Sequence, residues 1–316
     1  IAMSSRSYLK WAGGKSKIIN QMIDIIAEKP LDTSWKVTDE QSYLEPFIGS
    51  ASVFLGLKNS GIIENESKVI LSDINEILIA THKTIQNKKN LEKVVIKLKE
   101  MEKELSEKGP DYYYEIRDLL NLELTEGKGK DKIHTAANMI FINKACFNGL
   151  WRVNRNGEFN VPLGRSSNNS KRTIIQKERL NGFQTSTFGV NFKCNSWNKT
   201  IKLAKEGDLL YIDPPYLPIN EGEYVFTDYD KSGFPLKEHK KLAKACIDAA
   251  ERGVRVIISN NESDVLNKIY DKKKIKSQGV DYEKHLILLR RTMKTVIGGK
   301  REQIKEAVIF LSKKKN

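Results

Sequence analysis

The sequence predicts an α/β fold, a doubly wound sheet whose chain is interrupted by a helical insertion. Strand-like apolar runs at 69–72, 208–212, 254–259 and 307–311 alternate with helical patterns. Runs that are apolar almost throughout are typical of strands in sheets that helices cover on both faces. Between the first two runs, residues 76–145 form a long and highly charged helical pattern. The alternation predicts the sheet, and the charged pattern predicts the insertion.

The N-terminal elements come in this order. A Gly-containing stretch at 8–17 precedes an apolar-periodic helix at 18–26. A strand at 43–47 leads into a turn of small residues at 49–52, after which a helix begins. The next strand, at 69–72, completes the N-terminal part of the sheet.

The insertion and the C-terminal elements follow. Apolar residues recur in the insertion at intervals of three and four, at Leu91, Val94, Leu98, Met101 and Leu105. A polar, turn-rich stretch at 148–172 separates the insertion from the remaining strands. We therefore predict one discontinuous domain, 1–75 and 173–316, around an inserted domain at 76–172.

Composition limits the partners. The 316 residues contain 54 Lys+Arg against 40 Asp+Glu, a formal charge of +14 that favours a polyanionic partner, although a merely lysine-rich chain has the same charge. No run approaches the roughly 18 apolar residues of a membrane span, so no membrane partner is expected. The separated cysteines Cys146, Cys194 and Cys246 indicate a reducing cytoplasm. Neither cysteines nor histidines have the spacing of metal ligands, and no metal is expected.

The tetrapeptide Asp213-Pro214-Pro215-Tyr216 directly follows a predicted strand, at the edge where open α/β sheets carry reactive groups. The prolines lack amide donors, which leaves carbonyl oxygens free to accept hydrogen bonds. A purine amino group becomes nucleophilic when acceptors hold its N–H bonds. Asp213 and the carbonyl of Pro214 can do so while Tyr216 stacks on the base. Taken alone, the tetrapeptide is equally consistent with an ordinary proline-rich turn.

A second group of residues predicts a nucleoside site. Residues 45–51 place Glu45 at a strand end and small residues before a helix, where a nucleoside can approach the backbone closely. Asp73 ends the next strand, where a carboxylate accepts hydrogen bonds from ribose hydroxyls. No G-x-G-x-x-G cradle is present, and Leu9 stands where a P-loop ending in Gly14-Lys15-Ser16 needs its first glycine. A nucleoside cofactor without pyrophosphate fits, although a plain strand-helix turn would give the same pattern.

Further segments complete the pattern in chain order: 10–15, 45–49, Asp73, 143–154, 213–216 and Lys300-Arg301-x-x-Ile304-x-Glu306. Together they resemble the Dam-type DNA adenine-specific methyltransferases, the adenine amino-methyltransferases of the D-P-P-Y type. The resemblance covers nearly the whole chain. Ala51 departs from it, because the family usually has a second glycine there, and residues 277–290 are less typical.

The resemblance implies a Rossmann-like methyltransferase sheet that uses S-adenosylmethionine, yields S-adenosylhomocysteine and needs no metal. The domain at 1–75 and 173–316 is then catalytic, and 76–172 is a mostly helical DNA-recognition domain with a β-hairpin. The cofactor-binding residues that it implies are Lys10, Trp11, Ala12, Gly13, Gly14, Lys15, Glu45, Pro46, Phe47, Gly49, Asp73, Ser196, Trp197 and Asp213. The catalytic residues that it implies are Asp213, Pro214, Pro215 and Tyr216.

The resemblance also implies that the hairpin enters duplex DNA. The DNA-binding residues would be Lys10, Phe147, Asn148, Leu150, Arg152, Asn154 and Pro162. Their types suit the task, since Phe147 can wedge into a base step, Asn148 can cap an unpaired base and Arg152 can bind guanine through two hydrogen bonds. An exposed loop with Asn-Gly turns and incidental arginines is the structural alternative.

These implications describe a cytoplasmic enzyme of bacterial, archaeal or phage origin that binds double-stranded DNA. It would methylate the amino group of a flipped adenine in GATC, and a cognate restriction endonuclease could act on the same site. The alternatives are a longer GAT-containing site, methylation of adenine in RNA or of an amide nitrogen in protein, and a DNA-binding regulator without activity.

Overall fold

The computed structural model describes residues 6–11, 15, 18–29, 34–126, 131–165, 173–217, 233–289 and 304–316. It consists of two compact units. The first combines residues 1–14, 48–59 and 73–194, and the second combines 15–47, 60–72 and 195–316. The domain boundaries expected from the sequence, 75/76 and 172/173, divide the chain differently and remain a prediction.

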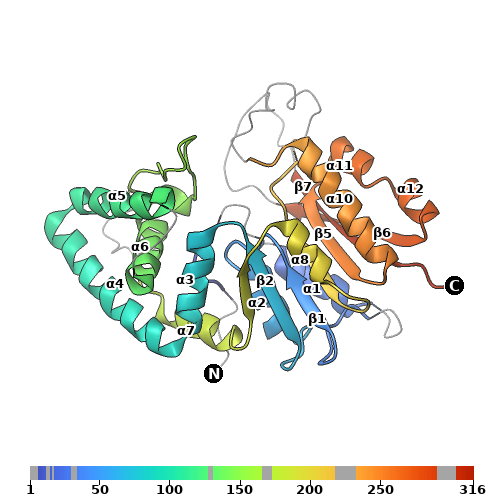
Figure 1. Ribbon diagram of the computed structural model, residues 1–316, viewed down its shortest axis with the longest axis horizontal. Coiled ribbons are helices and arrows are strands. Elements are labelled where there is room, and N and C mark those ends of the chain that lie inside the picture. The colour runs from blue at the N-terminus through green and yellow to red at the C-terminus, as the bar shows by residue number, and fades with distance from the viewer. Residues whose placement is uncertain are drawn as a thin grey trace. The chain divides into compact units, whose positions relative to one another are not determined.

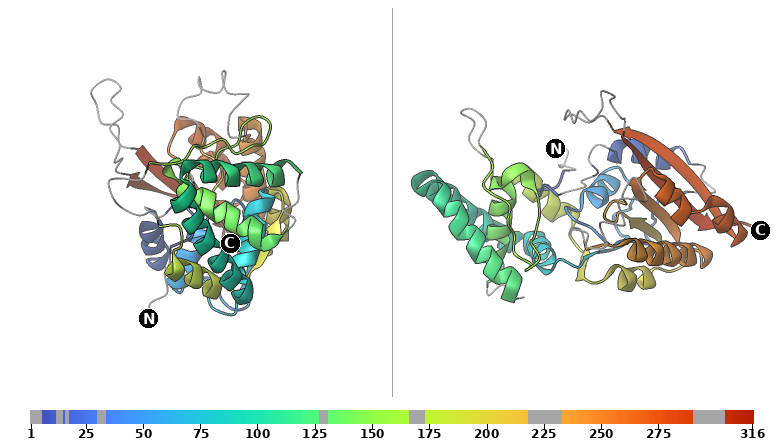
Figure 2. Two further views of the ribbon diagram at one scale, coloured as in Figure 1. Left: turned by 90° about the vertical axis from the view of Figure 1, so that its left-hand side faces the viewer. Right: turned by 90° about the horizontal axis from the view of Figure 1, so that it is seen from above.

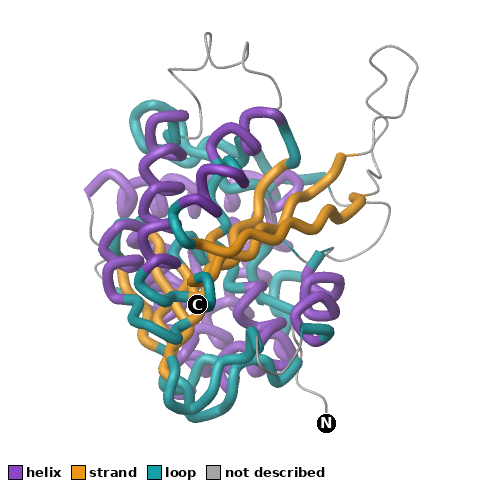
Figure 3. The backbone as a smooth tube through the Cα atoms, turned by 90° about the vertical axis from the view of Figure 1, so that its right-hand side faces the viewer, coloured by secondary structure: helices purple, strands orange, loops and turns teal. Residues whose placement is uncertain are grey.

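The strands form a seven-stranded sheet in the order β3-β2-β1-β4-β5-β7-β6. Strand β1 pairs in parallel with β2 and β4, and β4 pairs in parallel with β5. Strand β7 is antiparallel to both β5 and β6. Figure 3 shows the strands in orange, running side by side. The bounds are β1 Ser42–Glu45, β2 Lys68–Asp73, β3 Asn191–Cys194, β4 Leu209–Ile212, β5 Arg255–Asn261, β6 Val280–Leu289 and β7 Ile304–Lys313.

In the second unit, helices cover both faces of the sheet. Helices α8 and α10 lie over one face and α1 over the other (Figure 1). Strand β7 alternates accordingly: Ile309 and Leu311 join the core cluster that contains Leu242 of α10, while the Phe310 ring packs on Trp35, with 4.9 Å between ring centroids. The helices of this unit are α1 Ile19–Ala27, α8 Trp197–Leu203, α10 Leu236–Glu251, α11 Asp264–Ile269 and α12 Lys272–Ser277.

In the first unit, α6 is the central helix. Its residues from Thr135 to Asn143 are all buried, because α3, α4 and α5 each pack against it (Figure 2, left). Helix α4 is amphipathic, and its Leu91, Val94, Leu98 and Met101 are buried as their spacing predicts. The helices of this unit are α2 Ser52–Asn59, α3 Glu76–Gln86, α4 Lys88–Lys108, α5 Pro110–Glu126, α6 Lys132–Ala145, the 3-10 helix η2 Phe147–Gly149 and α7 Lys177–Ser186.

The structure confirms the predicted α/β class and differs from the sequence expectation in three elements. Strands β3 and β6 were not expected; β6 falls in the less typical stretch at 277–290. The expected hairpin contains, within the described residues 146–165, two isolated antiparallel bridges, Cys146 with Leu163 and Val153 with Phe159, and no regular strand. Within the described residues, no helix is long and apolar enough to cross a membrane.

Candidate active site

Two carboxylates predicted to be functional emerge at one edge of the sheet. Glu45 is the last residue of β1, and Asp213 follows β4 directly. Since Leu44 pairs with Leu210 in parallel register, both strands deliver their carboxyl ends to the same edge. Glu45 is buried and accepts a hydrogen bond from the Tyr43 hydroxyl, with 2.6 Å between oxygens. The fold therefore builds the acidic edge that the sequence predicts in the second unit.

Asp213 belongs to a buried charged cluster centred on Lys15. The Lys15 ammonium lies 3.2 Å from Asp213 Oδ1 and donates to the Tyr216 hydroxyl at 3.0 Å. It also forms an ion pair with Glu306 of β7. Lys15 is 3% exposed, Glu306 is fully buried, and Asp213 keeps 20% of its side chain exposed. A ligand can therefore reach Asp213, whereas Lys15 and Glu306 lie behind it.

Burial and charge set the protonation of this cluster. Burial raises the pKa of Asp213 to about 6; the Lys15 ammonium opposes this shift and the Glu306 carboxylate adds to it. Burial alone would lower the pKa of Lys15, but Asp213 and then Glu306 raise it above its usual value. At neutral pH, Lys15 is therefore cationic and Asp213 is ionised with a weakly basic carboxylate. Such a carboxylate can hold an N–H donor and can accept a proton from a cationic nitrogen.

In the first unit, a continuous chain of hydrogen bonds fixes the turn at Gly49. The Gly49 amide donates to Asp73 Oδ2 at 3.2 Å, and its carbonyl accepts from His82 Nε2 at 2.8 Å. Because a carbonyl only accepts, Nε2 carries the hydrogen and Nδ1 accepts from the Tyr8 hydroxyl at 2.7 Å. Burial lowers the pKa of His82 to about 4, so the ring stays neutral. Tyr8 and His82 were not expected from the sequence.

This turn is conformationally demanding. Phe47, Gly49 and Ala51 all have positive φ, at 62°, 50° and 62°. Ala51, at the position noted above as a departure from the resemblance, thus adopts a left-handed conformation at a cost of about 1 kcal/mol. A Cβ atom on Gly49 would lie 2.6 Å from Trp11, whose ring stacks on Trp151 with 5.5 Å between centroids. The turn leaves room for Trp11 only because residue 49 is glycine.

All the residues predicted to bind DNA except Lys10 lie on one segment, 146–163, which we call the recognition segment. Phe147 and Leu150 are 47% and 36% exposed, a high exposure for large apolar side chains. Asn148 has a left-handed backbone with φ 54°, and Arg152 donates to Asn160 Oδ1 at 2.8 Å. Asn154 shapes the following turn by accepting from the Glu158 amide at 3.1 Å.

Lys10 is held beside this segment. Its amide donates to Asn143 Oδ1 at 3.0 Å, and its carbonyl accepts from Asn143 Nδ2 at 2.7 Å. Its side chain packs so closely that a Cβ atom on Gly149 would lie 2.5 Å from Lys10 Cδ. The structure thus brings Lys10 together with the recognition segment, as expected, and assigns the clamping role to Asn143.

Helix α5 fixes the far side of the recognition segment. Asn121 Nδ2 donates to the Phe159 carbonyl at 3.0 Å, and its Oδ1 accepts from the Phe159 amide at 2.7 Å. Tyr113 and Arg117 both donate to the Val161 carbonyl, at 2.8 Å and 3.3 Å. The Phe147 amide donates to the Pro162 carbonyl at 2.9 Å and closes the segment. Side chains of α5 thus take the place of a neighbouring strand.

The remaining predicted residues are placed as follows. Ser196 and Trp197 begin α8 and line a hollow of about 400 Å³ with residues of α10. Pro46 and Pro214 are buried, and the Phe47 ring packs on Phe234. Ala12, Gly13 and Gly14 lie outside the described residues. No cluster that could hold a metal occurs within the described part of the chain.

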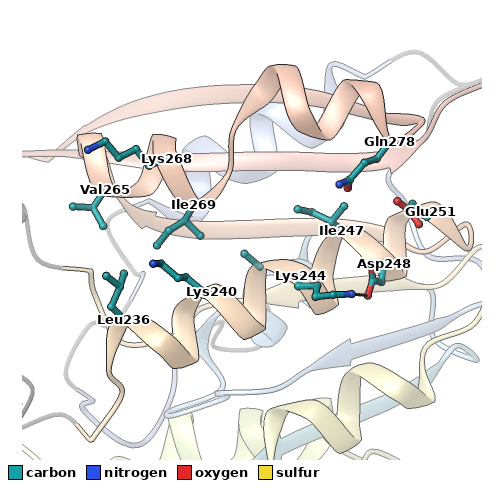
Figure 4. Close-up of a pocket in the computed structure, with 11 residues that line it drawn as sticks. Leu236, Lys240, Lys244, Ile247, Asp248, Glu251, Val265, Lys268, Ile269 and Gln278 are labelled. Atoms are coloured by element: carbon teal, nitrogen blue, oxygen red, sulfur yellow. Dashed lines mark hydrogen bonds and ion pairs between the residues drawn. The ribbon is translucent and has the colours of Figure 1, made fainter.

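A groove of about 770 Å³ lies elsewhere in the second unit, between α10 and α11 (Figure 4). Its lining is apolar at Leu236, Val265 and Ile269, with Lys240 and Lys244 along α10. None of the predicted site residues lines it. Its other lining residues include Asp248, Glu251 and Gln278, none of which belongs to the predicted site, so the groove is not the candidate active site.

Comparison with known proteins identifies the family. Residues 11–283 match the family model of the D12 class N6 adenine-specific DNA methyltransferases. The chain belongs to this family. It is therefore an enzyme that methylates adenine in DNA, and the family supports S-adenosylmethionine as its methyl donor. The resemblance inferred from the separate sequence segments is confirmed.

Three relatives are similar over most of this chain. The Type II methyltransferase M.MjaIII of Methanocaldococcus jannaschii is 32% identical over 85% of this chain and 89% of its own length. The DNA adenine methylase of Escherichia coli K12 is 28% identical over 96% of this chain and 94% of its own. The DNA N-6-adenine-methyltransferase of Escherichia phage P1 is 31% identical over 84% of this chain, which spans 31% of that protein.

Gly49→Ala is predicted to destabilise the enzyme by about 3 kcal/mol, from the strain of a positive φ and the overlap with Trp11. Gly61→Ala is the matched control, since Gly61 also has positive φ, 80°, but nothing within 4 Å of an added Cβ. The control should lose only about 1 kcal/mol. Chemical denaturation measures the free energy of unfolding of both variants. Equal losses would show that the overlap with Trp11 does not contribute.

Asn121→Ala is predicted to destabilise by about 1–3 kcal/mol, because the amide and the carbonyl of Phe159 lose their partner together. Leu119→Ala on the same helix is the control, since Leu119 is 49% exposed and its truncation should change stability by less than about 0.5 kcal/mol. Thermal denaturation compares the two variants. Similar losses of stability would show that the hydrogen bonds of Asn121 to Phe159 contribute nothing to stability.

Proposed function

We propose that this enzyme transfers a methyl group from S-adenosylmethionine to the exocyclic amino group of an adenine flipped out of duplex DNA, within the site GATC. The main observation in support of this proposal is the partly exposed Asp213 carboxylate directly after β4, which is paired with the buried Lys15 and, through it, with the buried Glu306. A partly exposed carboxylate in the tetrapeptide Asp213-Pro214-Pro215-Tyr216 supports binding of an amino group at this position.

The residues fit the cofactor by their chemistry. Gly49 leaves room for the Trp11 ring beside the turn, and the Asp73 carboxylate can accept from ribose hydroxyls while its oxygens hold the Gly49 and Asn75 amides. Burial raises the pKa of Asp73, and the hydrogen bonds from these amides oppose the rise. Bound S-adenosylmethionine supplies a sulfonium methyl that is already activated for transfer.

Asp213 and the Pro214 carbonyl then hold the two N–H bonds of the adenine amino group, which directs its lone pair toward the methyl carbon. The N–C bond forms as the S–C bond breaks, and the nitrogen becomes cationic. Asp213 accepts a proton from this nitrogen and passes it to water, leaving N6-methyladenine and S-adenosylhomocysteine. Tyr216, whose side chain is 41% exposed, offers its ring to the flipped base.

The recognition segment supplies DNA contacts. We assign Phe147 to the opened base step, Asn148 to the orphaned base, and Arg152 with Lys10 to base edges. Close cations support binding of a polyanion here: burial lowers the pKa of Lys144 to about 8, with Arg179 and Lys10 adding to the effect. Leu150, Asn154 and Pro162 complete the predicted contacts.

The wider assignments are proposals as well. Residues 1–75 and 173–316 would carry catalysis and 76–172 recognition, in the cytoplasm and without a metal. The Type II name of the relative from Methanocaldococcus jannaschii makes a cognate restriction endonuclease a reasonable partner to look for. The exact site is the least constrained assignment, because a longer GAT-containing site would use the same segment.

Asp213→Asn and Asp213→Ala should lower methyl transfer to duplex GATC by at least about 100-fold, because the acceptor for the amino group is lost. Labelled S-adenosylmethionine and duplexes with GATC, GATATC or neither measure it. Asp281→Ala, at an exposed position on β6, is the control and should be fully active. Label in GATATC alone would correct the site, and label in RNA alone would replace the substrate class.

Arg152→Ala should relax discrimination at the guanine position by about 1–3 kcal/mol, since two hydrogen bonds to the base edge are lost. The rates for GATC and for duplexes changed at that base pair measure the effect. Arg155→Ala is matched in type, segment and exposure, and should weaken all duplexes alike. If both variants behave alike, Arg152 reads no base.

A further inference from the structure

Glu306 on β7 is a fully buried carboxylate in direct contact with the candidate active site. It lies opposite Asn261 of β5 in the antiparallel register, and it forms an ion pair with Lys15. Its second oxygen, Oε2, has no hydrogen-bond partner among the described residues. Burying a carboxylate is costly unless it is well paired, so this incomplete pairing suggests a role beyond stability.

Asp213 is surrounded by groups from every neighbouring element. Lys15 and Glu306 are the charged groups in its cluster. Ser259 of β5 donates a hydrogen bond that lowers the pKa of Asp213. The other titratable neighbours are Tyr43 of β1, Tyr211 of β4 and Tyr216. Glu45 of β1 accepts a hydrogen bond from the Tyr43 hydroxyl. Lys15 thus pairs with Asp213, and Glu306 is a second carboxylate paired with the same ammonium.

We propose that Glu306 is a positioning residue for methyl transfer: it holds the Lys15 ammonium, so that Asp213 remains able to accept the N–H of the substrate amino group. The inference rests on the proposed function. Lys15 Nζ lies 3.2 Å from Asp213 Oδ1. With Asp213 as its sole counter-ion, the buried ammonium would be drawn fully onto this carboxylate and would compete with the substrate for it.

Glu306 also offsets the positive charge of Lys15 in the site. The amino nitrogen becomes cationic as the methyl group is added, and a neighbouring Lys15 ammonium by itself would disfavour that cation. Asp213 and Glu306 around one ammonium leave a net negative charge. The cluster is thus matched to a substrate that gains positive charge.

Glu306→Gln tests this, because glutamine keeps the shape and removes the charge. We expect kcat to fall roughly tenfold or more, with KM for S-adenosylmethionine and DNA within about twofold. Glu306 raises the pKa of Asp213 and Lys15 lowers it. The acid limb of the kcat–pH profile, which the Asp213 pKa of about 6 places near pH 6, should therefore move to lower pH in Glu306→Gln and to higher pH in Lys15→Met.

The double variant Lys15→Met/Glu306→Gln removes the ion pair as a unit and should recover part of the kcat that Glu306→Gln loses. Glu283→Gln is the matched control, since it breaks an ion pair on the adjacent strand with a 52% exposed carboxylate, and it should leave kcat and the acid limb unchanged. Circular dichroism and thermal denaturation establish that each variant is folded at the assay temperature.

A purely structural Glu306 would lower stability without moving the acid limb, and that result would overturn the inference. A double variant no faster than Glu306→Gln would overturn it as well. If the wild-type enzyme methylates no adenine in DNA, the proposed function fails and this inference with it. An active wild type whose acid limb is unchanged in Glu306→Gln overturns this inference alone.

Discussion

The buried ammonium of Lys15 is the interaction on which the candidate active site depends. A buried cation requires counter-ions. Lys15 pairs with Asp213, which directly follows β4, and with Glu306 on β7, and both carboxylates are distant from Lys15 in the sequence. The parallel pairing of β4 with β5 and the antiparallel pairing of β5 with β7 bring these carboxylates together. The antiparallel strand that departs from a purely parallel sheet is therefore the strand that completes the charged cluster.

In the first unit, side-chain hydrogen bonds replace regular secondary structure. The recognition segment contains two isolated bridges within the described residues, and Asn121 pairs with the Phe159 backbone as a neighbouring strand would. Asn143 binds the backbone of Lys10 in the same way. A segment held by side chains can present exposed Phe147 and Leu150 without the cost of an open sheet edge.

The Gly49 turn shows how strain is tolerated at a functional position. Three positive φ values within five residues are unfavourable, and the hydrogen bonds from His82 and to Asp73 hold the turn in place. Neutral His82 is suited to this role, because its fixed tautomer donates to a carbonyl and accepts from Tyr8. The turn thus relies on a buried network whose members are not adjacent in sequence.

The sequence by itself determined the α/β class, most strands and the helices at 76–145, and it singled out Asp213, Tyr216, Gly49 and Phe147 as candidate site residues. These follow from local patterns, since apolar runs, turn residues and short characteristic segments are read within a few residues of one another. Strand β6 was not predicted because it lies at the edge of the sheet, and its polar residues interrupt the apolar pattern of a buried strand. Phe147 was predicted to enter DNA because it is an aromatic residue in an otherwise polar stretch.

Only the tertiary structure decided which side chains support these residues. Glu306 pairs with Lys15 across 291 positions, Asn143 binds Lys10 across 133, and His82 binds Gly49 across 33. Nothing in the local spacing of a glutamate, an asparagine or a histidine indicates such a partner, because the contact exists only after strands and helices have packed. The sequence predicted the reaction, whereas the packing of distant elements decided the charge and the geometry of the candidate active site.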